Sequence, residues 1–241
     1  MADETLRLER IAEPMRQPIE EYVALVRETA GAGAASLTLI GAIAGGTFDA
    51  TRHSIRSVLV LKTIDLEMLR RFSEHGPKLG KRFIAAPLIM TDEYIKTSLD
   101  TFPLELLEIS QRHVTVFGED PFADMTFDDS HIRLQCEREL KTVLISLRQG
   151  LLAAAGRDKV LRAVELDIGD QLIRTLRGVL WLDGKKTSKP AAEVVAAVES
   201  MAKRKLTGVR ATLDVSGAHE WEQFQSLYRD VEALTEMADA W

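Results

Sequence analysis

The sequence predicts an α+β fold, with a mixed-sheet domain in residues 1–121 and an all-helical bundle domain in residues 122–241. Up to about residue 120, short runs of β-branched residues and leucine alternate with segments of helical periodicity, as in a small sheet flanked by helices. Beyond that point, most apolar residues recur at the i, i+3/i+4, i+7 spacing of amphipathic helices. The 241 residues, 46% of them hydrophobic, are enough for two domains that each bury a core.

Seven elements are expected in the first half. The helices are predicted at residues 6–29, 65–72 and 91–99, and the strands at 36–40, 58–61, 83–90 and 113–117. Pro14 and Pro18 predict a bend or an interruption in the first helix. Asp65 suits the N-cap of the second helix, because its carboxylate can accept hydrogen bonds from backbone N–H groups. The segment 102–109 (FPLELLEI) fits a helix or a strand, and both stay open.

The second half carries four apolar stripes. They begin at Cys136, Val160, Val194 and Trp221. Four amphipathic helices with short connections favour an antiparallel bundle. Cys136 lies on the first stripe, so we expect it in the packed core.

Composition excludes several classes of protein. The chain has 31 basic and 37 acidic side chains, a net charge of −6, so no general basic field favours nucleic acid. Cys136 is the single cysteine, which excludes an intrachain disulfide and a cysteine-based zinc cluster and favours a reducing compartment. The charged start MADETLRLER is unlike a signal peptide, and no apolar run approaches the ~20 residues of a membrane span. We therefore expect a cytoplasmic protein without a membrane partner.

A glycine-rich connection follows the strand predicted at 36–40. It reads Gly41-Ala42-Ile43-Ala44-Gly45-Gly46, and Ser54-Ile55-Arg56 then leads into the next strand. This layout resembles the polymerase-β-like nucleotidyltransferases. The segments 102–113, 118–121 and 133–140 further resemble bacterial relatives of the aminoglycoside nucleotidyltransferases. The resemblance covers about residues 20–155 by motif and the rest by helical pattern.

The resemblance implies a defined chemistry. In the family a glycine-serine turn lets backbone N–H groups and one hydroxyl approach a nucleoside triphosphate. Two aspartates two residues apart on a strand point to one face and, with a third carboxylate, hold Mg²⁺. The metal neutralises the phosphates and lowers the pKa of the attacking hydroxyl. A helical second domain supplies further carboxylates to the cleft between the domains.

This chain departs from the pattern at the metal ligands. Gly41 and Gly46 match the family's glycines, but Ala42 replaces the serine. Ser54 and Arg56 stand where the two aspartates are expected. A neutral hydroxyl is a poor Mg²⁺ ligand and a guanidinium repels the ion, so Mg²⁺ is not expected here. A nucleoside triphosphate stays a candidate ligand, and the residues that would bind it are Gly41, Ala42, Gly46, Ser54 and Arg56.

Several residues keep two interpretations. Glu105, with Glu108 as its alternative, is the candidate third carboxylate, and Glu139 is a candidate acid of the cleft. Arg56 either pairs with Glu105 or receives the phosphates of a nucleotide directly. A nearby loop acid, Asp49, is a turn former or a displaced metal ligand. Glu137, two residues before Glu139, is a second candidate cleft acid or a surface partner of Lys141, four residues later. Gly45 stands where relatives often place an arginine.

Three functions are expected, in this order. The first is a catalytically degenerate nucleotidyltransferase-like protein whose interdomain cleft binds a nucleotide, another small molecule or a partner protein. The second is an active Mg²⁺-dependent enzyme that transfers a nucleoside monophosphate to a hydroxyl. The third is a structural oligomerisation module, since the helices after residue 134 are strongly apolar. A second copy of the chain is therefore also a candidate partner.

Overall fold

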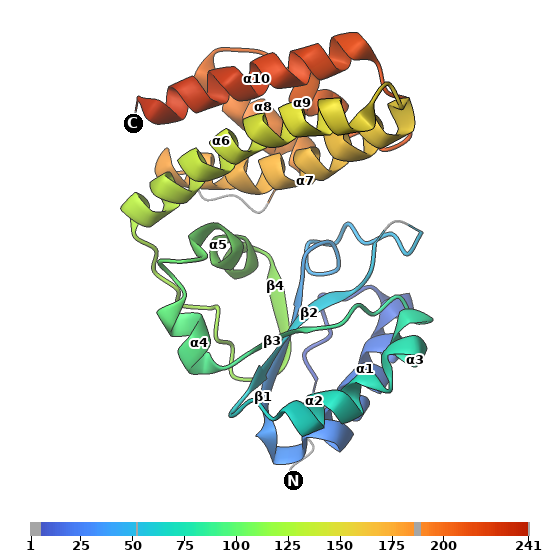
Figure 1. Cartoon of the computed structure of the whole chain (residues 1–241). Coiled ribbons are helices and arrows are strands. Elements are labelled where there is room, and N and C mark those ends of the chain that lie inside the picture. Colours follow the sequence, from blue (N-terminus) through green and yellow to red (C-terminus); the bar gives the residue numbers. More distant parts are fainter. Residues whose placement is uncertain (1–5, 52, 186–188, 241) are drawn as a thin grey trace. The chain divides into compact units, whose positions relative to one another are not determined.

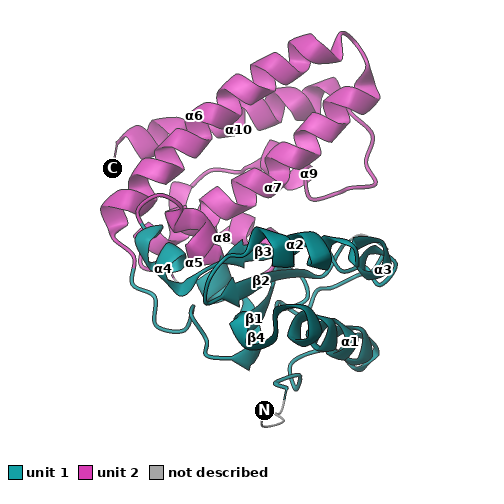
Figure 2. Cartoon of the chain, turned by 60° about the horizontal axis from the view of Figure 1, so that its bottom comes forward, with its two compact units in different colours: residues 1–99, 109–126 teal, residues 100–108, 127–241 magenta. Residues whose placement is uncertain are grey.

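The computed structural model describes residues 6–51, 53–185 and 189–240. Its chain forms two compact units, shown in two colours in Figure 2. Unit 1 contains residues 1–99 and 109–126, and unit 2 contains residues 100–108 and 127–241. The chain thus enters unit 2 briefly before it returns to unit 1 for its last strand.

Unit 1 is built on a mixed four-stranded sheet with the order β3-β2-β1-β4 (Figure 1). The strands are β1 (Ala34–Ile40), β2 (Arg56–Leu61), β3 (Leu88–Met90) and β4 (His113–Gly118). β1 is antiparallel to both β2 and β4, and β2 is parallel to β3. The expected strand at 83–90 is wrong over its first half. Only an isolated bridge forms there, between Ile84 and Ile55, and the strand begins after Pro87, which has no N–H to give to a ladder.

Three helices cover one face of this sheet: α1 (Glu13–Ala30), α2 (Leu66–Ser73) and α3 (Gly76–Gly80). Their apolar side chains pack against Leu37 and Leu39 of β1 and Leu59 and Leu61 of β2, which alternate along the strands. Within this core the hydroxyl groups of Tyr22 and Ser57 are 2.9 Å apart and share a hydrogen bond.

The first helix starts later than the expected residue 6. α1 begins at Glu13, because Pro14 suits the first turn of a helix, where its missing N–H costs nothing. The residues before it follow β4 instead, and the backbone N–H of Arg7 donates to the carbonyl of Val116 at 3.0 Å. Pro18 lies inside α1 without ending it. Asp65 caps α2, as predicted, and accepts from the N–H of Glu67 at 2.9 Å.

Two further helices precede β4. α4 (Asp92–Thr97) is capped by Thr91, whose hydroxyl accepts from the N–H of Tyr94 at 3.1 Å. α5 (Pro103–Gln111) settles the ambiguous segment as a helix. Leu104 and Leu107 of α5 are buried in a small cluster with Ile132, Cys136 and Val179 of unit 2. This cluster explains why the first turns of α5 belong to unit 2.

Unit 2 is entirely helical in the part of the chain that the structure describes. Its main helices are α6 (Asp129–Ala154), α7 (Asp158–Leu182), α8 (Ala191–Ala202) and α10 (Trp221–Asp239), with a short α9 (Thr207–Ala211) between the last two. The four main helices correspond to the four expected stripes, and α6 packs against α7 and α10 (Figure 1). Cys136 is buried as expected, and burial raises the pKa of its thiol to about 12. Among the described helices, none combines the length and apolarity that a bilayer crossing requires.

The contact between α9 and α10 depends on Gly208. A Cβ added at Gly208 would overlap the backbone of Leu227, which cannot move aside as a flexible side chain could. The carboxylate of Asp230 also accepts from the N–H groups of Gly208 at 2.7 Å and Val209 at 3.2 Å. These contacts require the backbones of the two helices to approach closely.

We expect Gly208→Ala to lower the free energy of unfolding by about 1–3 kcal/mol, the usual cost of overpacking a rigid site. Gly80→Ala is the control, since nothing lies within 4 Å of a Cβ added there and its φ is not left-handed. Urea denaturation of both variants measures the difference. Equal stability of the two would show that the α9–α10 backbones can separate without cost.

Candidate functional site

The glycine turn, residues 41–46, leaves the end of β1 in a fixed conformation. Gly41 and Gly46 have φ values of 73° and 70°, in the left-handed region that favours glycine. The N–H of Gly45 donates to the carbonyl of Gly41 at 3.0 Å, and the N–H of Thr47 donates to that of Ala42 at 3.0 Å. Ile43 and Ala44 are buried in the core of unit 1 and anchor the turn.

Strand register brings this turn beside Arg56. Ile40, the last residue of β1, pairs with Arg56 of β2 on one side and with His113 of β4 on the other. Ser54 and Arg56 are exposed while Ile55 between them is buried, so the two share a face, as expected for residues two apart. The structure therefore brings five predicted ligand-binding positions to one edge of the sheet: Gly41, Ala42, Gly46, Ser54 and Arg56.

Arg56 brings an exposed positive charge to this edge. Among the described residues, Arg56 has no carboxylate within ion-pair distance, and no group of three His, Cys, Asp or Glu side chains could hold a metal ion. Asp49 is a turn former: its carboxylate accepts from the N–H of Thr51 at 2.9 Å and from the Thr51 hydroxyl at 2.7 Å. With hydroxyl and guanidinium donors at Ser54 and Arg56, the edge does not fit Mg²⁺.

A residue that sequence reasoning did not single out, Arg112, also lies against the turn. A Cβ added at Gly45 would lie 2.8 Å from Cζ and 2.9 Å from Nε of Arg112, so the guanidinium fills the space of a side chain at position 45. Arg112 directly precedes His113, the β4 partner of Ile40. Arg112 can be identified only from the pairing of β1 with β4, and the local sequence pattern does not predict that pairing.

His113 and Asp120 form a part-buried pair next to the same edge. Nε2 of His113 lies 2.9 Å from the carboxylate of Asp120, and Nδ1 lies 2.9 Å from the carbonyl of Ile109. Burial alone would raise the pKa of Asp120, but hydrogen bonds from His113 and from the N–H of Phe122 outweigh it and hold this pKa below its ordinary value. Asp120 therefore stays ionised and connects β4 to the segment that follows it.

The candidate third carboxylate lies on a helix, one of the two structures that the sequence allowed for segment 102–109. Glu105 is on α5, where its carboxylate forms an ion pair with Arg174 at 3.0 Å and accepts from Nε2 of Gln135 at 3.0 Å. Its alternative, Glu108, lies 3.5 Å from the same guanidinium. The negative charges of Glu105 and Glu108 are thus both compensated by Arg174 of α7.

The two candidate cleft acids of α6 differ in their surroundings. Glu139 accepts a hydrogen bond from the side chain of Gln171 on α7. Glu137 forms the expected i,i+4 ion pair with Lys141 at 2.5 Å, and Lys141 also reaches Asp239 at 2.8 Å. The surface-pair interpretation of Glu137 is therefore confirmed, and a role for Glu105 or Glu139 beside the glycine turn stays a prediction.

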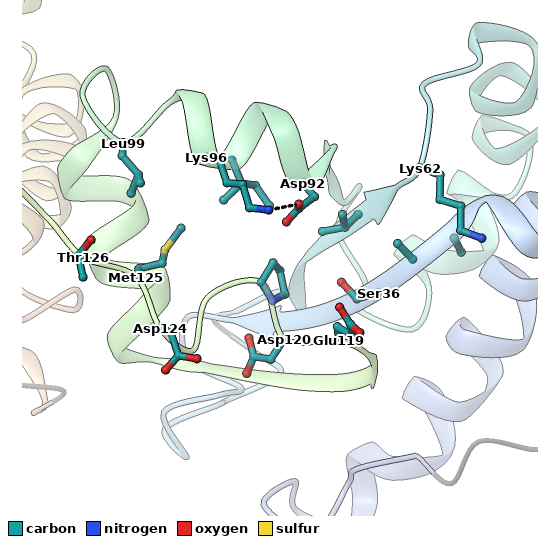
Figure 3. A pocket seen from close by; sticks show the side chains of 15 residues that line it. Ser36, Lys62, Asp92, Lys96, Leu99, Glu119, Asp120, Asp124, Met125 and Thr126 are labelled. Carbon is teal, nitrogen blue, oxygen red and sulfur yellow. Dashed lines mark hydrogen bonds and ion pairs between the residues drawn. The ribbon is translucent and has the colours of Figure 1, made fainter.

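A cavity of about 760 Å³ lies at the opposite end of β1 (Figure 3). Ser36 and Val60 of the sheet form part of its wall, with Ile95 and Leu99 from the α4 region. Several charged groups surround it: Lys62, Asp92, Lys96, Glu119, Asp120 and Asp124. Lys96 and Asp92 neutralise each other at 2.5 Å. The sequence did not indicate this cavity, because its walls come from segments far apart in the chain.

Comparison with known proteins identifies the fold alone. No family model matches the sequence, and no curated protein is significantly similar to it. Among solved structures, a spectinomycin adenyltransferase from Enterococcus faecialis, in complex with ATP and spectinomycin, is similar with a TM-score of 0.57. The match covers 92% of this chain and 98% of that chain at 10% sequence identity. The expected nucleotidyltransferase-like α+β fold with a helical second half is confirmed.

We expect Asp120→Asn to lower the free energy of unfolding by about 1 kcal/mol at neutral pH, since it removes a partly exposed charge-assisted contact with His113. Because the pKa of Asp120 is lowered on folding, its stabilisation is complete above the ordinary value of 3.8 and is lost as the pH falls through the lowered pKa. Urea denaturation from neutral pH into acid should therefore show the difference shrinking. Asp124→Asn is the control, since none of the hydrogen bonds or ion pairs among the described residues involves Asp124. A constant difference at all pH values would contradict the assignment.

Proposed function

We propose that this chain is a catalytically degenerate nucleotidyltransferase-like protein that binds the phosphates of a nucleotide at the glycine turn without a divalent metal. The observation that carries the proposal is the position of Arg56. Its backbone pairs with Ile40, one residue before Gly41, and its side chain is exposed on the face shared with Ser54. A guanidinium therefore stands where the family resemblance places a metal ligand.

The physical basis is charge neutralisation by the protein itself. A nucleoside triphosphate carries several negative charges, which a metal-dependent enzyme offsets with cations held by carboxylates. An arginine offers a permanent positive charge and two parallel N–H donors to one phosphate. Backbone N–H groups of a glycine turn add further donors at close approach. Together they replace the electrostatic contribution of Mg²⁺ to binding, but not its activation of a nucleophile.

A nucleotide is the ligand class that the structural neighbour favours. The similar adenyltransferase is in complex with ATP, and the structural match covers 92% of this chain. Loss of both metal-binding aspartates should lower phosphoryl transfer by orders of magnitude, because metal-borne charge supplies much of that catalysis. Binding without turnover is therefore the function we infer.

An active enzyme is the alternative. It would transfer a nucleoside monophosphate from a triphosphate to a hydroxyl, with Glu105 and Glu139 as its acids. The ion pair of Glu105 with Arg174 disfavours this alternative, because a carboxylate that holds a guanidinium is a weaker metal ligand.

A second candidate, self-association, is favoured by exposed apolar residues on α6. Leu134, Ile145 and Leu152 are 65%, 52% and 80% exposed, and their spacings of 11 and 7 residues place them on one side of the helix. Sedimentation of the wild-type chain and of Ile145→Lys with Leu152→Lys tests it. A dimer that the double change dissociates would support an oligomerisation role.

We expect the wild-type chain to bind ATP in the presence of EDTA, and Arg56→Gln to weaken this binding by about tenfold to a hundredfold, the usual cost of losing a charged hydrogen-bonding partner. Isothermal calorimetry measures both. Arg71→Gln is the matched control, since it removes the same charge from an exposed position on α2. No binding of ATP by the wild-type chain without metal would refute the proposal.

The metal requirement should be restored by two substitutions. In Ser54→Asp with Arg56→Asp, two carboxylates share one face at the end of the glycine turn, so ATP binding should become dependent on Mg²⁺. The wild-type chain should show no such dependence. Mg²⁺-dependent turnover of a nucleoside triphosphate by the wild-type chain would instead establish the active enzyme.

A further inference from the structure

Arg112 lies beside the same glycine turn as Arg56, on the opposite side of β1. We propose that it is the second guanidinium of the phosphate site, and that the two arginines select a ligand with more than one phosphoryl group. This inference rests on the proposed function and adds to it a binding residue and a ligand class.

The order of the strands places the two arginines on either side of the turn. β1 lies between β2 and β4, so Arg56 approaches from one neighbouring strand and Arg112 from the residue that precedes the other. Neighbouring strands are about 4.8 Å apart, which separates the two outer backbones by roughly 10 Å. Two long side chains whose backbones start this far apart on either side of one turn suit a di- or triphosphate chain better than a single phosphate.

The charge of Arg112 is uncompensated. In the part of the chain that the structure describes, no carboxylate forms an ion pair with Arg112, and its Nε is buried without a hydrogen-bond acceptor. Holding an unpaired charged donor away from water is costly, and an anion that binds beside it removes part of that cost. This differs from Arg174, which is held between two carboxylates, Glu105 and Glu108.

Gly45 connects Arg112 to the turn. Gly41 and Gly46 need glycine because their φ values are positive, whereas the φ of Gly45 lies outside the left-handed region. The conformation of Gly45 would thus accept alanine, but a Cβ would lie 2.8 Å from Cζ of Arg112, so the flexible end of this side chain would have to leave its present position. Glycine at position 45 thus leaves room for this guanidinium beside the turn.

A purely structural role is the competing explanation, in which Arg112 only fills the space above Gly45. The two explanations differ in how substitutions at the two positions combine. If Gly45 acts by seating Arg112 for the ligand, Gly45→Ala should weaken phosphate binding only when Arg112 is present. If Arg112 is structural, its loss should affect stability and leave binding unchanged.

The test measures binding of inorganic tripolyphosphate and of inorganic phosphate by calorimetry, in EDTA, to four full-length chains: wild type, Arg112→Gln, Gly45→Ala and the double variant. We expect tripolyphosphate to bind the wild-type chain at least tenfold more tightly than phosphate does. Arg112→Gln should weaken tripolyphosphate binding at least tenfold and should largely abolish that preference. Gly45→Ala should weaken tripolyphosphate binding in the wild-type background. In the Arg112→Gln background it should change tripolyphosphate binding by less than twofold.

Separate outcomes distinguish the two proposals. If Arg56→Gln weakens binding while Arg112→Gln leaves it unchanged, the inference about Arg112 is wrong and the proposed function stands. If the wild-type chain binds neither tripolyphosphate nor ATP in EDTA, both are wrong. Should Arg112→Gln fail to fold, Arg112→Lys decides: it keeps the charge but loses the two-pronged donor, so tripolyphosphate binding should fall by several fold. Unchanged binding by a folded Arg112→Lys together with unchanged binding by Gly45→Ala would overturn the inference.

Discussion

The register of β1 between β2 and β4 is the constraint on which the candidate site depends. Ile40 pairs with both Arg56 and His113, so the end of β1 lies between the beginnings of β2 and β4 at one edge of the sheet. The glycine turn follows directly from the end of β1. A slip of one residue in the pairing of β1 with β2 would turn Arg56 to the opposite face. The buried alternation of Leu37 and Leu39 against the helices prevents such a slip. The core of unit 1 thus fixes the charges at its edge.

Those charges have the opposite sign from the ones that the family resemblance implies. Carboxylates around a glycine turn attract a metal, and the metal then attracts phosphate, whereas guanidinium groups attract phosphate directly. In the proposed function, Ser54 and Arg56 stand in place of two of the three ligands that the resemblance implies. The remaining candidate, Glu105, is paired with Arg174 within unit 2. Under the proposed function, each of these residues would lower the affinity for Mg²⁺, and those at the sheet edge would favour an anion there.

Much of the fold could be predicted from the sequence, because local patterns determine it. The β-branched and leucine residues of the run Ser36–Ile40 predict a strand, and the structure contains it. The helical spacing of the apolar residues that begin at Cys136 and Val160 predicts two helices, which also form. The residues that sequence reasoning missed or misplaced depend on distant partners. Whether 103–111 forms a helix is decided by packing of Leu104 against Cys136, and Arg174 lies 69 residues from the carboxylate that it holds.

The glycine turn shows that the glycines of one motif can have different structural roles. Its glycines look alike in the sequence, yet two of them meet a conformational need, and Gly45 meets a second need, room for the Arg112 side chain in its present position. The first need belongs to the turn itself and can be inferred from the chain around it. The second belongs to Arg112, which approaches from across the sheet, so it appears only when β4 is placed beside β1. A glycine at position 45 and an arginine at position 112 are therefore one feature of the molecule. A change at either position must be judged by its effect on the other.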